Sequence, residues 1–152
     1  MAETLGSLCD KLTIVKLKQW HSEDPSRLQS LEQQESQLRE EIDGFVAAAV
    51  SGGIPIDRLT FAANKVYARD RNVVEAVAGN VGAVFSQLAT VNCALWHEQE
   101  KVYDFETVPA ESKNAVVKQL ALLNLQRTEC IDRIDRAFRE VVESRGHAPA
   151  NP

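Results

Sequence analysis

Each of the two tryptophans in this sequence is followed directly by a histidine, and histidine is the side chain best suited to proton transfer near neutral pH. The second pair, Trp96–His97, stands in a stretch of helical periodicity. Residues three or four positions apart share a helix face, which places His97 in a small polar row between two apolar stripes. The row predicts a polar seam in which His97 is an acid-base or hydrogen-bonding group, and thus our candidate catalytic residue. Its members are Ser86, Thr90, Cys93, His97 and Asp104, with Glu100 and Lys101 flanking them.

The first pair, Trp20–His21, repeats the second, because residues 5–24 align with residues 81–100 without a gap. Asp10 precedes His21 by three helical turns, roughly 16 Å along a helix axis, so the two side chains cannot touch each other. A third group between helices could approach either one. His21 and Asp10 are therefore candidate binding residues, with a structural role favoured for His21. A satisfied core histidine is the structural alternative for His97.

Three polar residues interrupt apolar stripes of other helices, namely Glu35, Asn124 and Arg127. Charged side chains are seldom buried without a partner, because removing a lone ion from water costs several kcal/mol. Arg127 therefore requires either a carboxylate, for which Glu35, Asp10 and Asp104 are candidates, or an anionic ligand. The alternative is an internal ion pair that fixes helix register, with Asn124 as a device for specificity. We predict Arg127 as the anion contact, Asn124 as an orienting group, and Glu35 as a further candidate binding residue.

A connection of about twenty residues, "IPIDRLTFAANKVYARDRN", separates the second and third predicted helices. Long connections in compact domains are uncommon and are usually functional or disordered. Its Phe61, Val66 and Tyr67 favour an ordered loop. Lys65 and Tyr67 are candidate binding residues that would close the site. Arg69 and Arg71 could add positive charge, or could form a solvated basic surface.

The spacing of potential metal ligands does not match the motifs of helical metalloproteins. The Glu-x-x-His motif of di-iron bundles is absent, because Lys18 and Ala94 stand three positions before the two histidines. We therefore predict no metal site; His97, Glu100 and His21 are the residues that would assemble one. The pairs Glu32-x-x-Glu35 and Glu129-x-x-Asp132 resemble magnesium ligands of helical pyrophosphohydrolases, but such pairs are common on acidic helices. A glycine-rich phosphate loop, a zinc-type cysteine pair and a nucleophile elbow are also absent.

Apolar periodicity predicts helices over about residues 3–22, 25–50, 72–104 and 110–143. Asp24 can cap the second, with Pro25 in its first position, and "SGG" at 51–53 can stop it. The first helix is apolar on most sides and is expected at the centre. We predict an all-α fold, an antiparallel four-helix bundle with a long ordered loop between helices two and three. Residues 1–145 would form one domain and residues 146–152 a flexible tail.

The composition excludes several classes of function. The 152 residues carry a net charge of −5, which argues against nucleic acid as a partner. They contain no apolar run long enough to predict a membrane span, and the N-terminal residues lack the pattern of a signal peptide. Three scattered cysteines, Cys9, Cys93 and Cys130, predict buried reduced thiols and a cytoplasmic location.

Four segments resemble a bacterial family known as domain of unknown function 4254: "LCDKLTIVKLKQWHSED", "FAANKVY", "LATVNCALWHEQEKVYD" and "LNLQRTECIDRID". The resemblance covers most of residues 5–138. Its most specific parts are the second Trp-His helix and the segment of Asn124 and Arg127. It implies a helical protein and, since members are often encoded near glycosyltransferase genes, a cell-envelope sugar context. It implies no activity, and any cofactor stays unknown.

The sequence thus predicts a bundle that binds a small anionic metabolite, such as a sugar phosphate or a nucleotide-linked sugar, in its polar seam. Whether a reaction follows binding stays open. One alternative is an interaction module that forms a homo-oligomer or docks beside a partner, with internal polar groups that only set register. Another is a metal-dependent hydrolase.

Overall fold

The computed structural model describes residues 2–61, 74 and 76–146, and these form helices without any strand. The four long helices are α1 (Leu5–Trp20), α2 (Pro25–Val50), α3 (Val81–Tyr103) and α4 (Lys113–Gly146). Short 3-10 turns are η1 (Ile56–Arg58), η2 (Phe105–Thr107) and η3 (Ala110–Ser112). The predicted all-α class is confirmed. Lys65, Tyr67, Arg69 and Arg71 lie outside the described residues, as do positions 147–152.

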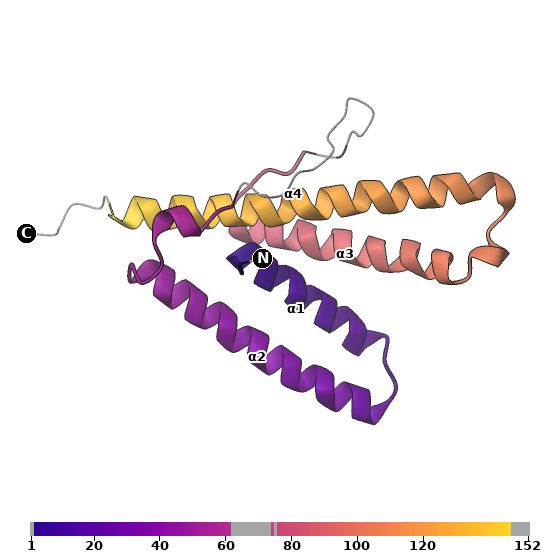
Figure 1. Ribbon diagram of the computed structural model, residues 1–152, viewed down its shortest axis with the longest axis horizontal. Coiled ribbons are helices and arrows are strands. Elements are labelled where there is room, and N and C mark those ends of the chain that lie inside the picture. Colours follow the sequence, from indigo (N-terminus) through magenta and orange to yellow (C-terminus); the bar gives the residue numbers. More distant parts are fainter. Residues whose placement is uncertain (1, 62–73, 75, 147–152) are drawn as a thin grey trace, which may run out of the picture.

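The helices form two antiparallel hairpins, α1 with α2 and α3 with α4 (Figure 1). Helix α1 contacts all three other long helices, which confirms its predicted central position. Helix α2 packs mainly on α1 and diverges from α4 toward its own N-terminal end (Figure 1). Near its C-terminal end, the ring centroids of Phe45 and Phe138 are 6.2 Å apart. The bundle is therefore splayed, and α1 lies between its two halves.

The predicted ends of α2 are confirmed, and α1 has a cap that the sequence analysis did not name. Thr4 caps α1 by accepting from the amide of Ser7, and Asp24 caps α2 by accepting from the amide of Arg27. Pro25 occupies the first position of α2, where a missing N–H leaves no donor unpaired. Beyond Ser51, Gly52 has a φ of +81°, a conformation that favours glycine and ends the helix.

The third helix is shorter than predicted, since it begins at Val81 and not near residue 72. Gly79 has a φ of +121°, which is incompatible with an α-helix, and Asn80 is the extended cap residue. Arg133 of α4 donates from Nε to the Gly79 carbonyl at 3.2 Å. On the other side of the connection, Arg139 Nη1 donates to Thr60 Oγ1 at 3.1 Å.

The apolar repeat of α4 predicts Val117 and Val141 on its buried face, and the structure corrects this. Both are exposed, whereas the adjacent Val116 and Val142 are buried. Each valine stands in a Val-Val pair, so periodicity alone could not choose between neighbours 100° apart on the helix. The buried apolar cluster is formed by Leu5, Cys9, Ala49, Leu59, Val84, Leu88, Val91, Leu123, Cys130, Ile134, Phe138 and Val142.

Two of the three cysteines are buried as predicted. Burial raises the pKa of both Cys9 and Cys130 to about 11, so these thiols stay protonated near neutral pH. Cys93 is exposed, which corrects the prediction, because its helix face is turned to solvent. Within the described part of the chain, no helix combines the length and apolar character that crossing a bilayer requires.

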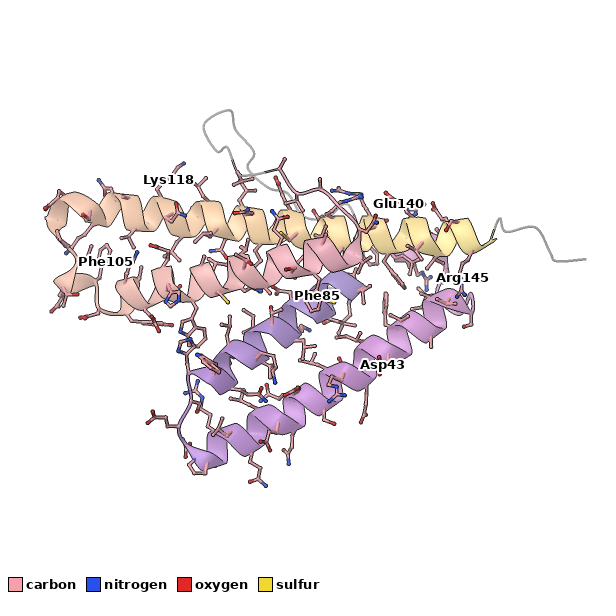
Figure 2. All side chains as sticks on the ribbon, turned by 180° about the vertical axis from the view of Figure 1, so that it is seen from behind. Asp43, Phe85, Phe105, Lys118, Glu140 and Arg145 are labelled. Carbon is pink, nitrogen blue, oxygen red and sulfur yellow. The ribbon has the colours of Figure 1, made fainter. Side chains whose placement is uncertain are left out.

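Figure 2 labels Phe105 at the far end of the second hairpin. The ammonium of Lys113 lies 4.9 Å from the centroid of the Phe105 ring. This cation-π contact joins the first turn of α4 to η2, directly after α3. The contact helps to hold the segment between α3 and α4 against the start of α4.

The two Trp-His pairs meet across the hairpins. The His21 ring stacks on the Trp96 ring, with centroids 4.7 Å apart and planes inclined by 10°. Trp96 is held in turn by Glu100, which accepts from its indole Nε1 at 2.8 Å. Trp20 has no such role, since its side chain is 85% exposed. The two copies of the pair therefore differ, and the histidine of the first pair contacts the tryptophan of the second pair.

Because of this asymmetry, we expect His21 and Trp20 to contribute unequally to the free energy of unfolding. We expect His21→Ala to lower the free energy of unfolding by about 1 kcal/mol, because it removes a stacked contact between the hairpins. Trp20→Ala should change it by less than about 0.5 kcal/mol. Urea denaturation of both variants measures the difference. Equal losses would show that the stack contributes nothing specific.

Candidate functional site

The centre of the molecule is an ion pair between Asp10 of α1 and Arg127 of α4. Arg127 donates from Nε to Asp10 Oδ1 at 2.7 Å and from Nη2 to Asp10 Oδ2 at 2.5 Å. The Asp10 side chain is buried, and that of Arg127 is 33% exposed. The two parallel hydrogen bonds fix the orientation of the guanidinium, in addition to the attraction between the two charges. Bonding to Asp10 raises the pKa of Arg127 above its already high ordinary value, so the guanidinium stays charged.

Two further groups hold the Asp10 residue from α3 and from its own helix. Asn92, which is 1% exposed, donates from Nδ2 to Asp10 Oδ1 at 2.9 Å and to Thr13 Oγ1 at 2.6 Å. Thr13 donates in turn to the Asp10 carbonyl at 2.8 Å. One carboxylate thus joins α1, α3 and α4. The Asn92 Oδ1 atom is buried without a hydrogen-bond partner among the described residues.

A second buried carboxylate, Asp135, anchors the start of α1 on α4. Its Oδ1 accepts from the Gly6 amide at 2.7 Å. The approach requires glycine, since a Cβ at position 6 would lie 2.4 Å from the Ile131 carbonyl oxygen. Burial raises the pKa of Asp135 to about 6, against the lowering effect of hydrogen bonds from Gly6 and Thr4. Asp135 therefore titrates closer to neutrality than an ordinary aspartate does.

The first of two cavities beside the Asp10–Arg127 pair lies against α1 and α2, and we call it the α1–α2 cavity. It has a volume of about 410 Å³, within the range of small-molecule sites. Three cationic side chains reach it, and amides and apolar groups complete its wall. The lining residues are Asp10, Lys11, Ile14, Val15, Lys18, Gln34, Gln37, Leu38, Glu41 and Arg127.

The second cavity lies between the start of α1 and α4, and we call it the α1–α4 cavity. Its volume is about 640 Å³, and its wall is richer in carboxylates and hydroxyls. Asp10, Lys11 and Arg127 belong to both cavities, so the ion pair separates them. The remaining lining residues are Ala2, Glu3, Thr4, Ser7, Phe61, Thr128, Ile131, Asp132 and Asp135.

Among the predicted site residues, the structure brings together Asp10 and Arg127. It thereby supports the internal ion pair that was the alternative to an anion contact, although Arg127 still lines both cavities. Glu35 lies elsewhere, where it accepts from Lys16 Nζ at 3.0 Å and from Gln19 Nε2 at 2.9 Å. These two bonds lower the pKa of Glu35 and join α2 to α1. Glu35 is thus a link between helices that lines neither cavity.

The predicted seam around His97 is wrong, because its row faces solvent. Ser86, Thr90, Cys93 and His97 are all exposed, and the His97 side chain is 70% accessible. Thr90 bonds back to the Ser86 carbonyl at 3.2 Å, as hydroxyls on helices commonly do. The structure places His97 in neither cavity.

The placement of Asn124 in the core is also corrected, since it is exposed and donates to the Leu120 carbonyl at 3.0 Å. It precedes Leu125 by one position, so its own direction is outward while Leu125 is buried. An asparagine among apolar residues therefore marked the helix surface here, and Asn124 lines neither cavity.

His97 Nδ1 lies 3.6 Å from Glu100 Oε2, while His21 stacks on Trp96 and does not join them as a ligand set. Over residues 2–61, 74 and 76–146, no group of three or more histidine, cysteine, aspartate or glutamate side chains is arranged to hold a metal ion.

Sequence reasoning missed Asn92, Asp135 and Lys18. Asn92 follows Leu88 by four positions, and Asp135 precedes Phe138 by three, so each shares a helix face with buried apolar residues. That spacing was a usable signal. Lys18 lies on a helix that is otherwise largely apolar, and the sequence alone could not assign it to a cavity without the position of α2.

Comparisons with protein families, curated proteins and solved structures found no match to this chain. The resemblance to domain of unknown function 4254 thus stays an expectation from the segments quoted above.

The raised pKa of Asp135 predicts a pH dependence of stability. The folded state holds the Asp135 proton up to about pH 6, whereas the unfolded chain releases it near its ordinary value of 3.8. This group's contribution to the free energy of unfolding therefore falls as pH rises through that window. Asp135→Asn should remove this dependence, so the stability of wild type relative to the variant should fall by about 2 kcal/mol between pH 4 and pH 7.5.

Urea denaturation at the two pH values measures this difference. Asp43→Asn, at an exposed position on α2, is the matched control and should behave like wild type (Figure 2). A stability difference between wild type and Asp135→Asn that is the same at both pH values would contradict the assignment.

Proposed function

We propose that this chain binds a small anionic metabolite, of the phosphorylated-sugar class, in the α1–α2 cavity. The observation that carries the proposal is the convergence of Lys11, Lys18 and Arg127 on one cavity of suitable size. Lys18 makes no ion pair with any residue that the structure describes. Its charge is thus available to a ligand.

The wall of the α1–α2 cavity suits a ligand with two kinds of polar group. Lysine binds phosphate as a compact charge, and arginine binds it through planar N–H groups. Arg127 uses Nε and Nη2 on Asp10, which leaves Nη1 without a described partner. Gln34 and Gln37 supply amides, and Glu41 supplies an acceptor for hydroxyl groups. A ligand that matches this wall carries negative charge on one part and hydroxyl groups on another, as a sugar phosphate or a nucleotide-linked sugar does.

The ion pair gives this cavity its fixed geometry. Because Asp10 is held by Asn92 and Arg127 is held by Asp10, the guanidinium cannot swing away from the wall. Preorganised donors reduce the entropy lost when a ligand binds. Among its described lining residues, the cavity contains neither a histidine nor a cysteine, so we propose binding and assign no reaction. The sugar context that the family resemblance implies agrees with this ligand class. We also propose that the protein is cytoplasmic.

An interaction module is the second candidate, favoured by the exposure of two large aromatic side chains. Trp20 and Tyr103 are each 85% accessible. Exposed aromatic groups are enriched at protein interfaces. Light scattering of wild type and Trp20→Ser at several concentrations tests for a homo-oligomer: a dimer lost in the variant would support this candidate, and a monomer in both would exclude self-association through Trp20.

The anion proposal predicts a selective loss in Lys18→Gln. A charge-assisted hydrogen bond contributes roughly 1.5–3 kcal/mol, so removing it should weaken binding of a sugar phosphate about tenfold or more. Lys16→Gln is the matched control, since it removes the same charge from the same helix at a residue bonded to Glu35, outside the cavity. Titration calorimetry measures both, with ligands chosen by a thermal-shift screen of sugar phosphates, nucleotide-linked sugars and neutral sugars.

The neutral sugar should bind at least tenfold more weakly than its phosphate, and His97→Ala should bind like wild type. No binding by any member of the panel, or equal losses in Lys16→Gln and Lys18→Gln, would overturn the proposal.

A further inference from the structure

We propose that the ligand of the α1–α2 cavity is an amino sugar phosphate, and that Glu41 binds its ammonium group at the end of the cavity opposite the phosphate. This inference rests on the proposed function and adds to it the class of ligand and its direction in the cavity. It is carried by the register of α1 against α2, by the charges at each end of the cavity, and by the hydrogen bond that holds Glu41.

The contacts of Glu35 give the register of the antiparallel helices α1 and α2 (Figure 1). Glu35 of α2 accepts from Lys16 Nζ at 3.0 Å and from Gln19 Nε2 at 2.9 Å, so it lies at the level of these two residues of α1. Glu41 follows Glu35 by six residues, or about 9 Å along the helix axis. In an antiparallel pair, this displacement leads back along α1 toward Lys11.

The α1–α2 cavity therefore has two ends of different composition. Lys18 and Gln34 line the end that lies next to the contacts of Glu35. Lys11 precedes Lys18 by seven residues, about 10 Å along α1, and marks the other end, where Glu41 lies. Long side chains reach inward from both ends, so a hexose phosphate can contact both. Lys18 forms no ion pair with a described residue, which makes its end the place for the phosphate.

The charges at the Glu41 end favour a cation. Lys11 is paired there with Glu3, and Arg127 is paired with Asp10, so each of these cations already has a carboxylate. Glu41 adds a third carboxylate to the two pairs, and no cation of the described residues forms an ion pair with it. A ligand that brings positive charge to this end restores the balance.

Gln37 holds the Glu41 carboxylate on the cavity wall without neutralising it. Gln37 Nε2 donates to Glu41 Oε1 at 2.8 Å, and both residues line the cavity. This donor is neutral, and it leaves Glu41 Oε2 for a ligand. An ammonium group donates a charge-assisted hydrogen bond to a carboxylate, which is about twice as strong as a neutral one. A sugar with an ammonium in place of one hydroxyl group therefore gains affinity at this end.

The test compares glucosamine 6-phosphate with glucose 6-phosphate, which carries a hydroxyl in place of the ammonium group. Titration calorimetry of the full chain near pH 6.5, where the sugar amine is protonated, should show about tenfold tighter binding of glucosamine 6-phosphate. Glu41→Gln should weaken the amino sugar about tenfold and change glucose 6-phosphate by less than about threefold, because the amide keeps an oxygen that accepts from a hydroxyl.

Glu40→Gln is the matched control, since it removes the same charge from the neighbouring, exposed position of α2, outside the cavity. It should leave both affinities unchanged. Lys18→Gln tests the direction of the ligand: it should weaken both compounds about tenfold or more and preserve their ratio, because both carry the phosphate that Lys18 contacts.

Equal affinities of the two compounds for wild type, or a preference for glucosamine 6-phosphate that survives in Glu41→Gln, would overturn this inference and leave the anion site standing. The same loss in Glu40→Gln would also overturn it, because the effect would then come from the overall charge of α2. Absence of binding by both compounds would overturn the inference together with the proposed function.

Discussion

The arrangement of the helices depends on the carboxylate of Asp10, which is buried where α1, α3 and α4 meet. Arg127 forks onto it and Asn92 donates to it, so one side chain of α1 sets the position of both helices of the second hairpin. Burial of the two charges costs several kcal/mol, and the bidentate geometry with an added amide donor offsets that cost. Apolar residues of similar volume could stabilise the same contact, but they would not impose one register.

The ion pair also explains why the molecule has two cavities of different character. Helix α2 diverges from α4 toward its own N-terminal end (Figure 1), and the two cavities lie on either side of the Asp10–Arg127 pair. On the α2 side, Lys11 and Lys18 project from the polar strip of α1. On the other side, α4 contributes Asp132 and Asp135. The positive and negative linings thus follow from which helix faces each space.

Sequence periodicity was sufficient to predict four helices, since an apolar repeat of 3.6 residues indicates a helix without knowledge of its neighbours. It also identified Arg127 as needing a carboxylate and Asp10 as a candidate. It failed for His97 and Asn124 because a polar residue beside apolar ones on a helix can face either a neighbouring helix or the solvent, and periodicity within one helix does not give the position of its neighbours. The start of α3 was missed because an apolar run continued past Gly79, whose left-handed backbone is not visible in hydropathy.

The central claim, that Asp10 and Arg127 act as one structural unit, is tested most directly by a double-mutant cycle with Asp10→Leu and Arg127→Met, followed by urea denaturation. Each single substitution leaves a partly buried charge without its partner and should lower the free energy of unfolding by about 2–4 kcal/mol. The double variant should be less destabilised than the sum of the two, with a coupling of at least about 2 kcal/mol. Additive losses of less than about 1 kcal/mol each would contradict the account.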